Sequence, residues 1–298
     1  MAAVPAPEIT YKVPKRRHPV VQFALTQPLG TAGLLIIIVM FVAGVFAPWV
    51  APYDPLALDY GAMLAAPSWE HWLGTDAFGR DVFSRIIFGA RTALMVGFLS
   101  SIIGCTVGAV IGVVSAYFGG RIDMVVQRLM DVLLSFPIIV LALAVVTVLG
   151  KWKVLGLDMN LIVAIAIPMV PKVARVVRSS ALAIREMPYI DAARAAGFSH
   201  SRIMFRHIIP NVVAPYLIML TAFVAQAILL EASLSFLGLG VTEPSAAWGL
   251  MLSGSSQEFY REAPWMIIFP GVAISLAVFA FNLFGDSLRD WLDPKLKL

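Results

Sequence analysis

The chain has 298 residues, of which 60% are hydrophobic and 13% charged, against about 45–50% and about 25% in ordinary soluble domains. A soluble fold of this length could not bury so much apolar surface, so the composition indicates a membrane protein. It excludes disordered, collagen-like and disulfide-stapled chains. The single cysteine, Cys105, has no partner for an internal disulfide. The net charge of +4 comes without a basic domain or an aromatic-interleaved basic patch, which argues against nucleic-acid binding.

Apolar residues recur along the whole chain in six segments, each close to the ~20 residues that cross a bilayer as a helix. The first is too long for the apolar region of a cleaved signal peptide, which has about 7–15 residues. The fourth is the weakest, because it contains Pro168 and Pro171. The predicted spans are Leu29–Val50, Thr92–Phe118, Val132–Leu149, Met159–Val177, Val212–Leu230 and Trp265–Phe284.

The placement of basic residues predicts the orientation of these spans. With a cytoplasmic N-terminus, 16 Lys and Arg residues fall on the inside and six on the outside. This bias follows the positive-inside rule, and six spans return the C-terminus to the cytoplasm. We therefore expect a cytoplasmic tail over residues 1–28 and one membrane domain over 29–298.

Three connecting segments are too long to be simple turns. Residues 51–91 are predicted to lie outside, and residues 178–210 inside, where they are expected to be helical. Residues 231–264, rich in Gly and Ser, are predicted outside, with part of the segment returning into the bundle.

The second predicted span carries a small residue at every fourth position, which places these residues on one helical face. Such a face lets a neighbouring helix approach closely. The neighbour could be a helix of the same chain, a partner subunit or a helix that slides during gating. The residues are Ser100, Gly104, Gly108, Gly112 and Ala116.

The predicted inside segment contains a helix–turn–helix pattern. Pro188 suits the first turn of a helix, and Gly197 suits the left-handed position that ends one. Ser199 or Ser201 can cap a second short helix that stops before Pro210. From these residues alone, the hairpin could be a docking site or a surface feature without a partner.

Polar side chains also occur at membrane depth. Gln226 and Glu231 lie in or at the end of the fifth predicted span, where they could form hydrogen bonds between helices or line a pathway or gate. Arg128 and Asp131, three residues apart, are predicted to form an ion pair. In the outer segment, His71 and Trp72 could pack the loop or contact a binding protein.

The hairpin resembles the EAA loop of permease subunits in ATP-binding-cassette importers. That loop has Glu-Ala-Ala, Gly after three residues and Pro thirteen residues later, and here Asp191-Ala192-Ala193, Gly197 and Pro210 stand at those intervals. Asp191 replaces the usual Glu, and His207 stands where an aliphatic residue is commoner. The resemblance implies that the hairpin couples to an ATPase through Asp191, Ala192, Ala193, Ala196, Gly197, Phe198 and Pro210.

Further segments are similar to the second permease subunit of dipeptide and oligopeptide importers. The outer-loop run from His71 to Arg85 includes His71, Trp72, Asp76, Arg80 and Asp81. Other matching runs are 116–120, 231–240 and 285–290. Their order matches the family over nearly the whole chain beyond the N-terminal tail.

This resemblance implies an all-α, six-span protein of the type I importer permease fold in a bacterial inner membrane, with both termini cytoplasmic. The implied partners are a second homologous permease, two cytoplasmic ATP-binding subunits, an outer solute-binding protein and membrane lipid. The chain has no phosphate loop, because Gly150-Lys151 is followed by Trp152 and Val145 replaces the first Gly. No catalytic or metal-binding residue is expected, and ATP and magnesium would bind the partner ATPases.

Three alternatives stay open at this point. An ion-coupled secondary transporter would commonly show inverted repeats and broken helices, which this sequence shows poorly. A membrane assembly protein without transport is disfavoured by the outer-loop motif. An importer of the same kind could also carry a nickel chelate, glutathione or an oligosaccharide instead of peptides.

Overall fold

A computed structural model describes residues 19–154 and 156–292. Most of the predicted N-terminal tail and the last basic residues of the chain lie outside this described part. The regular secondary structure of the described chain is helical, apart from one antiparallel hairpin, in which Lys153 pairs with Asp158, and an isolated bridge between Thr75 and Asp81.

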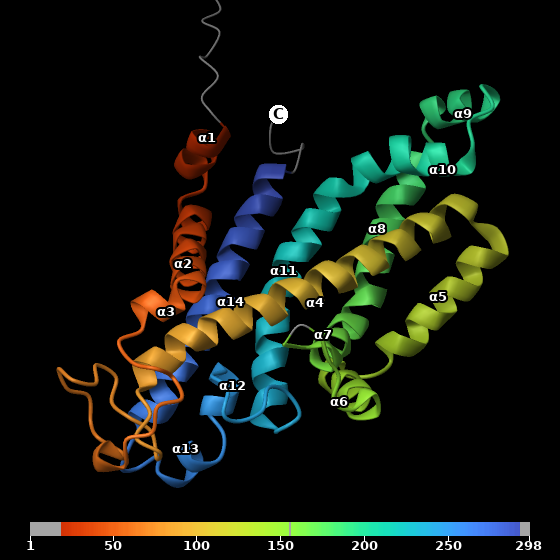
Figure 1. The fold of residues 1–298 in the computed structure, drawn as a ribbon. Helices are drawn as coiled ribbons and strands as arrows, with labels where there is room; N and C mark the ends of the chain where they lie inside the picture. The colour runs from red at the N-terminus through yellow and green to blue at the C-terminus, as the bar shows by residue number, and fades with distance from the viewer. Residues whose placement is uncertain (1–18, 155, 293–298) are drawn as a thin grey trace, which may run out of the picture.

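The elements follow one another in a simple order along the chain (Figure 1). They are α1 (Pro19–Thr26), α2 (Pro28–Val45), α3 (Ala47–Val50), η1 (Tyr60–Ala62), α4 (Val82–Phe118), α5 (Gly120–Leu134), α6 (Ile138–Leu149), β1 (Lys153–Val154), β2 (Leu157–Asp158), α7 (Met159–Ala166), η2 (Ile167–Met169), α8 (Val170–Arg185), α9 (Pro188–Ala195), α10 (His200–Ile203), η3 (Met204–Ile208), α11 (Ile209–Phe236), α12 (Trp248–Met251), α13 (Ser255–Glu258) and α14 (Trp265–Leu292).

Five helical stretches of the described chain are long and apolar enough to cross a membrane, and a bent pair of helices makes six if it counts as one span. The stretches are 28–45, 82–118, 159–185, 200–236 and 265–292. Each contains most or all of one predicted span.

The third predicted span was wrong as a single continuous helix. Residues 132–149 straddle a bend of 95° between α5 and α6. Pro137 lies at this break, directly before the first residue of α6. Proline disfavours helical geometry in the residue before it, and α5 accordingly ends at Leu134. Helix α6 has 12 residues and is about 18 Å long at 1.5 Å per residue, too short to cross a bilayer alone.

Several helices also begin or end beyond the predicted spans. Helix α4 begins at Val82, where the Asp81 side chain accepts a hydrogen bond from the Ser84 N–H and caps the helix. The stretch 159–185 accommodates its prolines because Pro168 lies in the 3₁₀ turn η2 and Pro171 in the first turn of α8.

Helix α4 is the centre of the fold. It packs against α8, α11 and α2, while α14 packs against α2 and α11. One apolar cluster joins α4, α7, α8 and α11, and a second joins α2, α4, α11, α12 and α14. The chain therefore forms one helical body around α4.

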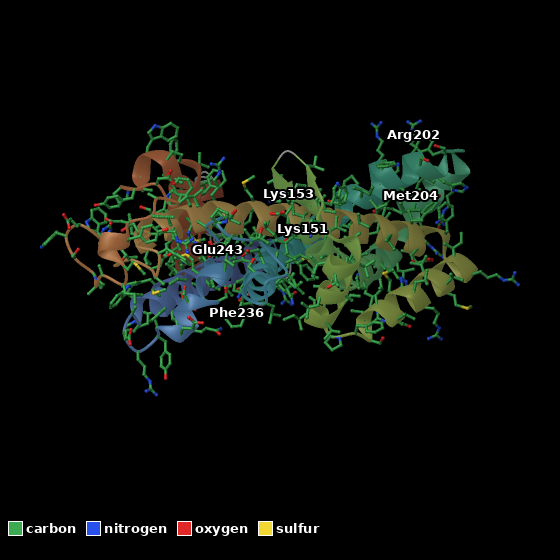
Figure 2. The ribbon with its side chains drawn as sticks, turned by 60° about the horizontal axis from the view of Figure 1, so that its bottom comes forward. Lys151, Lys153, Arg202, Met204, Phe236 and Glu243 are labelled. Atoms are coloured by element: carbon green, nitrogen blue, oxygen red, sulfur yellow. The ribbon has the colours of Figure 1, made fainter. Side chains whose placement is uncertain are left out.

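The functional features lie at two ends of this body. Helices α9 and α10 lie at one end together with α1 and the last turns of α14 (Figure 1). We call this the hairpin end. The opposite end, the loop end, carries residues 51–81 and 237–264 with α3, α12 and α13. In Figure 2, Arg202 and Met204 of the hairpin end lie far from Glu243 of the loop end.

Candidate functional site

The α9–α10 hairpin is built by local capping signals. Pro188 occupies the first turn of α9. At the other end of α9, the Gly197 N–H donates to the Arg194 carbonyl and the Phe198 N–H to the Ala193 carbonyl, the bond pattern of a Schellman motif. Gly197 has a φ of +74°, a conformation that costs other residues free energy. This is the helix, Gly turn and helix that the sequence predicts.

The short helix α9 divides into a packed side and a free side. Ile190 and Ala193 are buried against the bundle, whereas Asp191, Ala192 and Ala196 are exposed. Asp191 accepts a hydrogen bond of 3.0 Å from Arg194, on the same helix. The free side is therefore small, weakly charged and accessible to another molecule.

The turn after α9 is held by an aromatic and cationic cluster. The Arg202 guanidinium lies 4.0 Å from the centre of the Phe198 ring. His207 stacks on Phe198 with ring centroids 6.2 Å apart. Phe198 is therefore half-buried at the turn.

Two long-range hydrogen bonds fasten the hairpin end to α4. His200 Nδ1 and the Tyr117 hydroxyl are 2.8 Å apart, and Arg185 donates to the Ala116 carbonyl over 2.8 Å. Pro210 lies in the first turn of α11, which follows η3 without interruption. Sequence reasoning missed both bonds, because their partners are 83 and 69 positions apart.

The small-residue face of α4 lies against α7, η2 and α8 of the same chain. A Cβ on Gly104 would lie 2.7 Å from the Ala166 carbonyl oxygen, and one on Gly112 would lie 2.5 Å from the Ala174 carbonyl oxygen. Ser100 and Ala116 on this face are fully buried. These residues therefore allow backbone-to-backbone approach.

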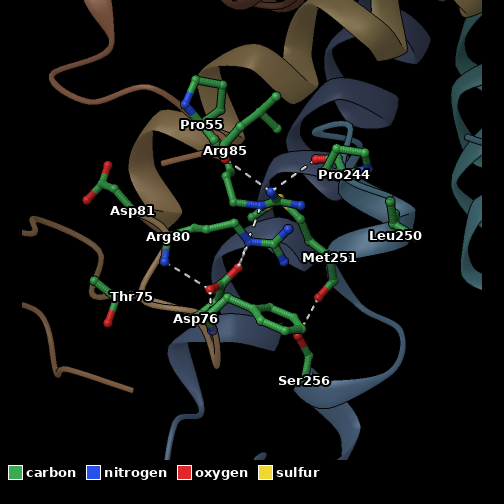
Figure 3. A network of polar contacts seen from close by, with 12 residues as sticks. Pro55, Thr75, Asp76, Arg80, Asp81, Arg85, Pro244, Leu250, Met251 and Ser256 are labelled. Carbon is green, nitrogen blue, oxygen red and sulfur yellow. Dashed lines mark hydrogen bonds and ion pairs between the residues drawn. The ribbon is translucent and has the colours of Figure 1, made fainter. Parts of the chain in front are cut away.

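At the loop end, polar side chains form a network that joins segments far apart in sequence (Figure 3). Arg80 donates to Asp76 over 2.6 Å and to Glu243 over 2.8 Å. Burial by itself lowers the pKa of Arg80, but the hydrogen bond to Glu243 and the charge of Asp76 outweigh it and raise that pKa. Arg85, 1% exposed, lies 3.8 Å from Asp76. The network holds residues 51–81, the first turn of α4 and the segment before α12 together.

The other outer-loop candidates support the same region. His71 Nδ1 lies 3.0 Å from the carboxylate of Asp81, the capping residue of α4. Trp72 is 57% exposed and packs on Phe83. The structure thus brings His71 and Asp81 together and leaves Trp72 largely accessible.

The two pathway candidates lie on α11 but differ in environment. Glu231 is completely buried, and one of its oxygens accepts a hydrogen bond of 2.7 Å from Ser235. Gln226 is half-buried. The segment after α11 returns to the bundle, as expected, because Gly249 of α12 lets its backbone touch Ala232.

The structure also tests the predicted polar contacts near the bend. The ion pair between Arg128 and Asp131 is confirmed at 3.5 Å, and Arg175 of α8 contacts the same carboxylate.

Arg85 and Glu243 were missed as members of the loop-end network, although Arg85 is the last residue of the outer-loop motif. Among the described residues, no group of three His, Cys, Asp or Glu side chains could hold a metal ion.

Comparison with known proteins identifies the chain. The model of the family described as binding-protein-dependent transport system inner membrane component matches residues 108–298. A second model, the N-terminal membrane domain of oligopeptide transport permease C, matches residues 25–67. Together they cover the hairpin end, most of the bundle and the first span.

Named relatives agree with this match. The dipeptide transport system permease protein DppC of Alkalihalophilus pseudofirmus is 44% identical over 90% of this chain and 86% of its own length. The glutathione transport system permease protein GsiD of Pectobacterium atrosepticum is 40% identical over 92% and 89%. The inward-facing methionine ABC transporter MetNI shares the fold, with a TM-score of 0.54 at 18% identity over 71% of this chain and 98% of that chain. The chain therefore belongs to the binding-protein-dependent transport system inner membrane components, as a multi-pass permease subunit of an ABC importer in the inner membrane.

Proposed function

We propose that this chain and a second, homologous permease form a pathway for peptides, which an outer solute-binding protein delivers. Two cytoplasmic subunits that bind ATP and magnesium supply the energy. Relatives named for dipeptide and glutathione transport support a peptide cargo, since glutathione is itself a short peptide. An ion-coupled secondary transporter is disfavoured by the same relatives.

The free side of α9 carries this proposal. Asp191, Ala192 and Ala196 are exposed on a helix whose other side is fixed by Ile190 and Ala193. Small side chains let a partner approach the helix backbone, and Asp191 provides one polar contact. We infer that an ATP-binding subunit docks on this face.

The covalent path from the hairpin gives a physical route for coupling. Helix α10 continues through η3 directly into α11, so a push on the hairpin moves the helix that carries Gln226 and Glu231. The bond between His200 and Tyr117 transmits the same push to α4. Of the two pathway candidates, half-buried Gln226 is the better placed to meet a cargo, whereas Glu231 holds Ser235 beside it.

We test the coupling role with Gly197→Val. A β-branched residue tolerates positive φ poorly, and the left-handed conformation costs about 1–2 kcal/mol for a residue with a Cβ, so the turn should change shape. We expect peptide uptake by the reconstituted importer to collapse and peptide-stimulated ATP hydrolysis to be lost. Uptake is measured with a labelled dipeptide in proteoliposomes.

The matched control is Gly150→Val. Gly150 also has positive φ, +61°, and open space around the missing side chain, but it lies outside the hairpin. This variant should retain uptake. If Gly197→Val took up peptide and stimulated ATP hydrolysis at the wild-type level, the coupling role would be contradicted. If the unaltered importer hydrolysed ATP but took up no peptide, only the peptide cargo would be contradicted.

A further inference from the structure

A groove between α2 and α4 opens on the side of the bundle near the loop end. Its volume is about 450 Å³, and its lining is apolar except for Arg91. Phe41 and Val45 contribute from α2, and Leu94, Met95 and Phe98 from α4. The groove is as large as typical small-ligand sites, about 300–1,000 Å³.

A second hollow adjoins this groove and shares Arg91 with it. Its volume is about 660 Å³, and its polar lining includes Tyr53, Asp54 and Thr92. Arg91 is exposed, and its side chain forms no hydrogen bond or ion pair with any residue that the structure describes. A cation therefore stands where an apolar groove meets a polar hollow.

The positions of these residues along the helices place the polar hollow at the edge of the bilayer. Phe41 and Phe98 lie deeper in their spans than Val45 and Arg91. Just beyond Val45, Trp49 is 78% exposed, and exposed tryptophans of membrane proteins gather at the membrane–water interface. The chemistry thus changes from apolar to cationic to mixed polar along one line towards the interface.

We propose that this line is a binding site for one zwitterionic phospholipid with an ammonium headgroup. An acyl chain lies in the apolar groove, the phosphate binds the Arg91 guanidinium, and the ammonium group pairs with the carboxylate of Asp54. One Asp54 oxygen accepts the Leu56 N–H, which orients the carboxylate without saturating it. A headgroup without a positive charge would leave Asp54 unpaired beside the phosphate.

The proposal is tested on the intact importer, purified in mild detergent, by native mass spectrometry. The probes are dioleoyl phosphatidylethanolamine and dioleoyl phosphatidylglycerol at equal concentration. The wild-type importer should retain one phosphatidylethanolamine per copy of this chain. The Arg91→Leu variant should retain about tenfold less, as expected for a lost charge-assisted contact. Lys151→Ala, which removes an exposed cation outside both hollows, should bind as the wild type does.

Asp54→Asn gives the sharper result, because Asp54 is exposed and its loss should leave the fold intact. This variant should lose its preference for phosphatidylethanolamine over phosphatidylglycerol. Equal retention by wild type and Arg91→Leu would overturn the proposal, as would an unchanged preference in Asp54→Asn. A photo-crosslinker at Met95 should label lipid, and labelling of another importer subunit would overturn the site as well.

Discussion

The two ends of the molecule treat their polar groups in opposite ways. At the loop end, Asp76, Arg80 and Arg85 are each less than 10% exposed and bind one another or nearby backbone. At the hairpin end, the Asp191–Arg194 pair is exposed on both sides. The buried network at the loop end satisfies its own charges, whereas the hairpin end presents this pair to solvent.

This difference shows which polar groups find their partners within the chain and which remain available to another subunit. A buried ion network is costly to disturb, since removal of one partner strands a charge away from water. An exposed pair adds little stability and is easily rearranged by a partner. The loop end is therefore expected to move as one rigid unit. The hairpin end is expected to form further polar contacts only when another subunit binds it.

The largest expected effect concerns which end faces the cytoplasm. The 16-to-6 bias of basic residues predicts that the hairpin end is inside. A reporter fused after Leu298 should be active on the cytoplasmic side, and one inserted at Ser68 on the outer side. The readout is all or none. An outward signal at the C-terminus would reverse the assignment of the two ends.

The next effect concerns the loop-end network. Asp76→Ala removes the carboxylate that binds Arg80 and faces Arg85. Buried Arg80 would then keep only Glu243 as an anionic partner, and buried Arg85 would keep only its backbone carbonyl acceptors. We expect a loss of about 3–5 kcal/mol in the free energy of unfolding, measured by denaturation of the purified importer in detergent.

The control for this variant is Glu70→Ala, in the same segment but exposed. It should change the free energy of unfolding by less than about 0.5 kcal/mol. Similar effects of the two substitutions would show that the network does not stabilise the loop end.

Sequence reasoning predicted the hairpin end well because its structure is set by local signals. Pro188, Gly197 and Ser199 act within one turn of their own positions, and such signals are readable without knowing the fold. The loop-end network could be predicted only in part. Arg80 and Asp76 are close in sequence, but Glu243 lies 163 positions from Arg80, and the packing of α12 brings it there.

The bend between α5 and α6 shows a different limit. The apolar run 132–149 has the length of a span, and hydropathy alone does not reveal the direction of a helix. The signal was present in Pro137, which disfavours helix in the residue before it. Burial is likewise a property of the fold, so Glu231 could be recognised as a polar residue at depth but not as a fully buried one.

A third prediction concerns the body that connects the two ends. In Gly108→Leu, the new Cβ would lie 2.7 Å from the Val170 carbonyl oxygen and 2.8 Å from the Val173 Cβ. We expect a loss of about 3 kcal/mol in the free energy of unfolding and a lower yield of assembled importer. Val110→Leu, at a position 52% exposed, should be tolerated. Normal assembly of Gly108→Leu would show that α4 and α8 can separate without cost.

The smallest expected effect on stability is at the hairpin end. Asp191→Ala removes an exposed ion pair worth about 0.2–1 kcal/mol and a carboxylate near the start of α9, worth about 0.3–1 kcal/mol. The free energy of unfolding should therefore fall by roughly 0.5–2 kcal/mol, which is less than the loss expected for Asp76→Ala. Peptide uptake should fall more clearly than stability, because Asp191 is proposed to contact an ATP-binding subunit.

Two matched variants separate the contact from the helix. Arg194→Ala removes the same ion pair but keeps the carboxylate, and Asp191→Glu keeps the charge with a longer side chain. If Asp191 contacts a partner, Arg194→Ala and Asp191→Glu should retain more peptide-stimulated ATP hydrolysis than Asp191→Ala. The defect of Asp191→Ala should also appear as weaker association of the ATP-binding subunits, and raising the salt concentration should reduce the difference from the wild type, because salt screens exposed charges. Equal defects in Asp191→Ala and Arg194→Ala would place the effect within α9 itself, and the hairpin end would then resemble the loop end in satisfying its own charges.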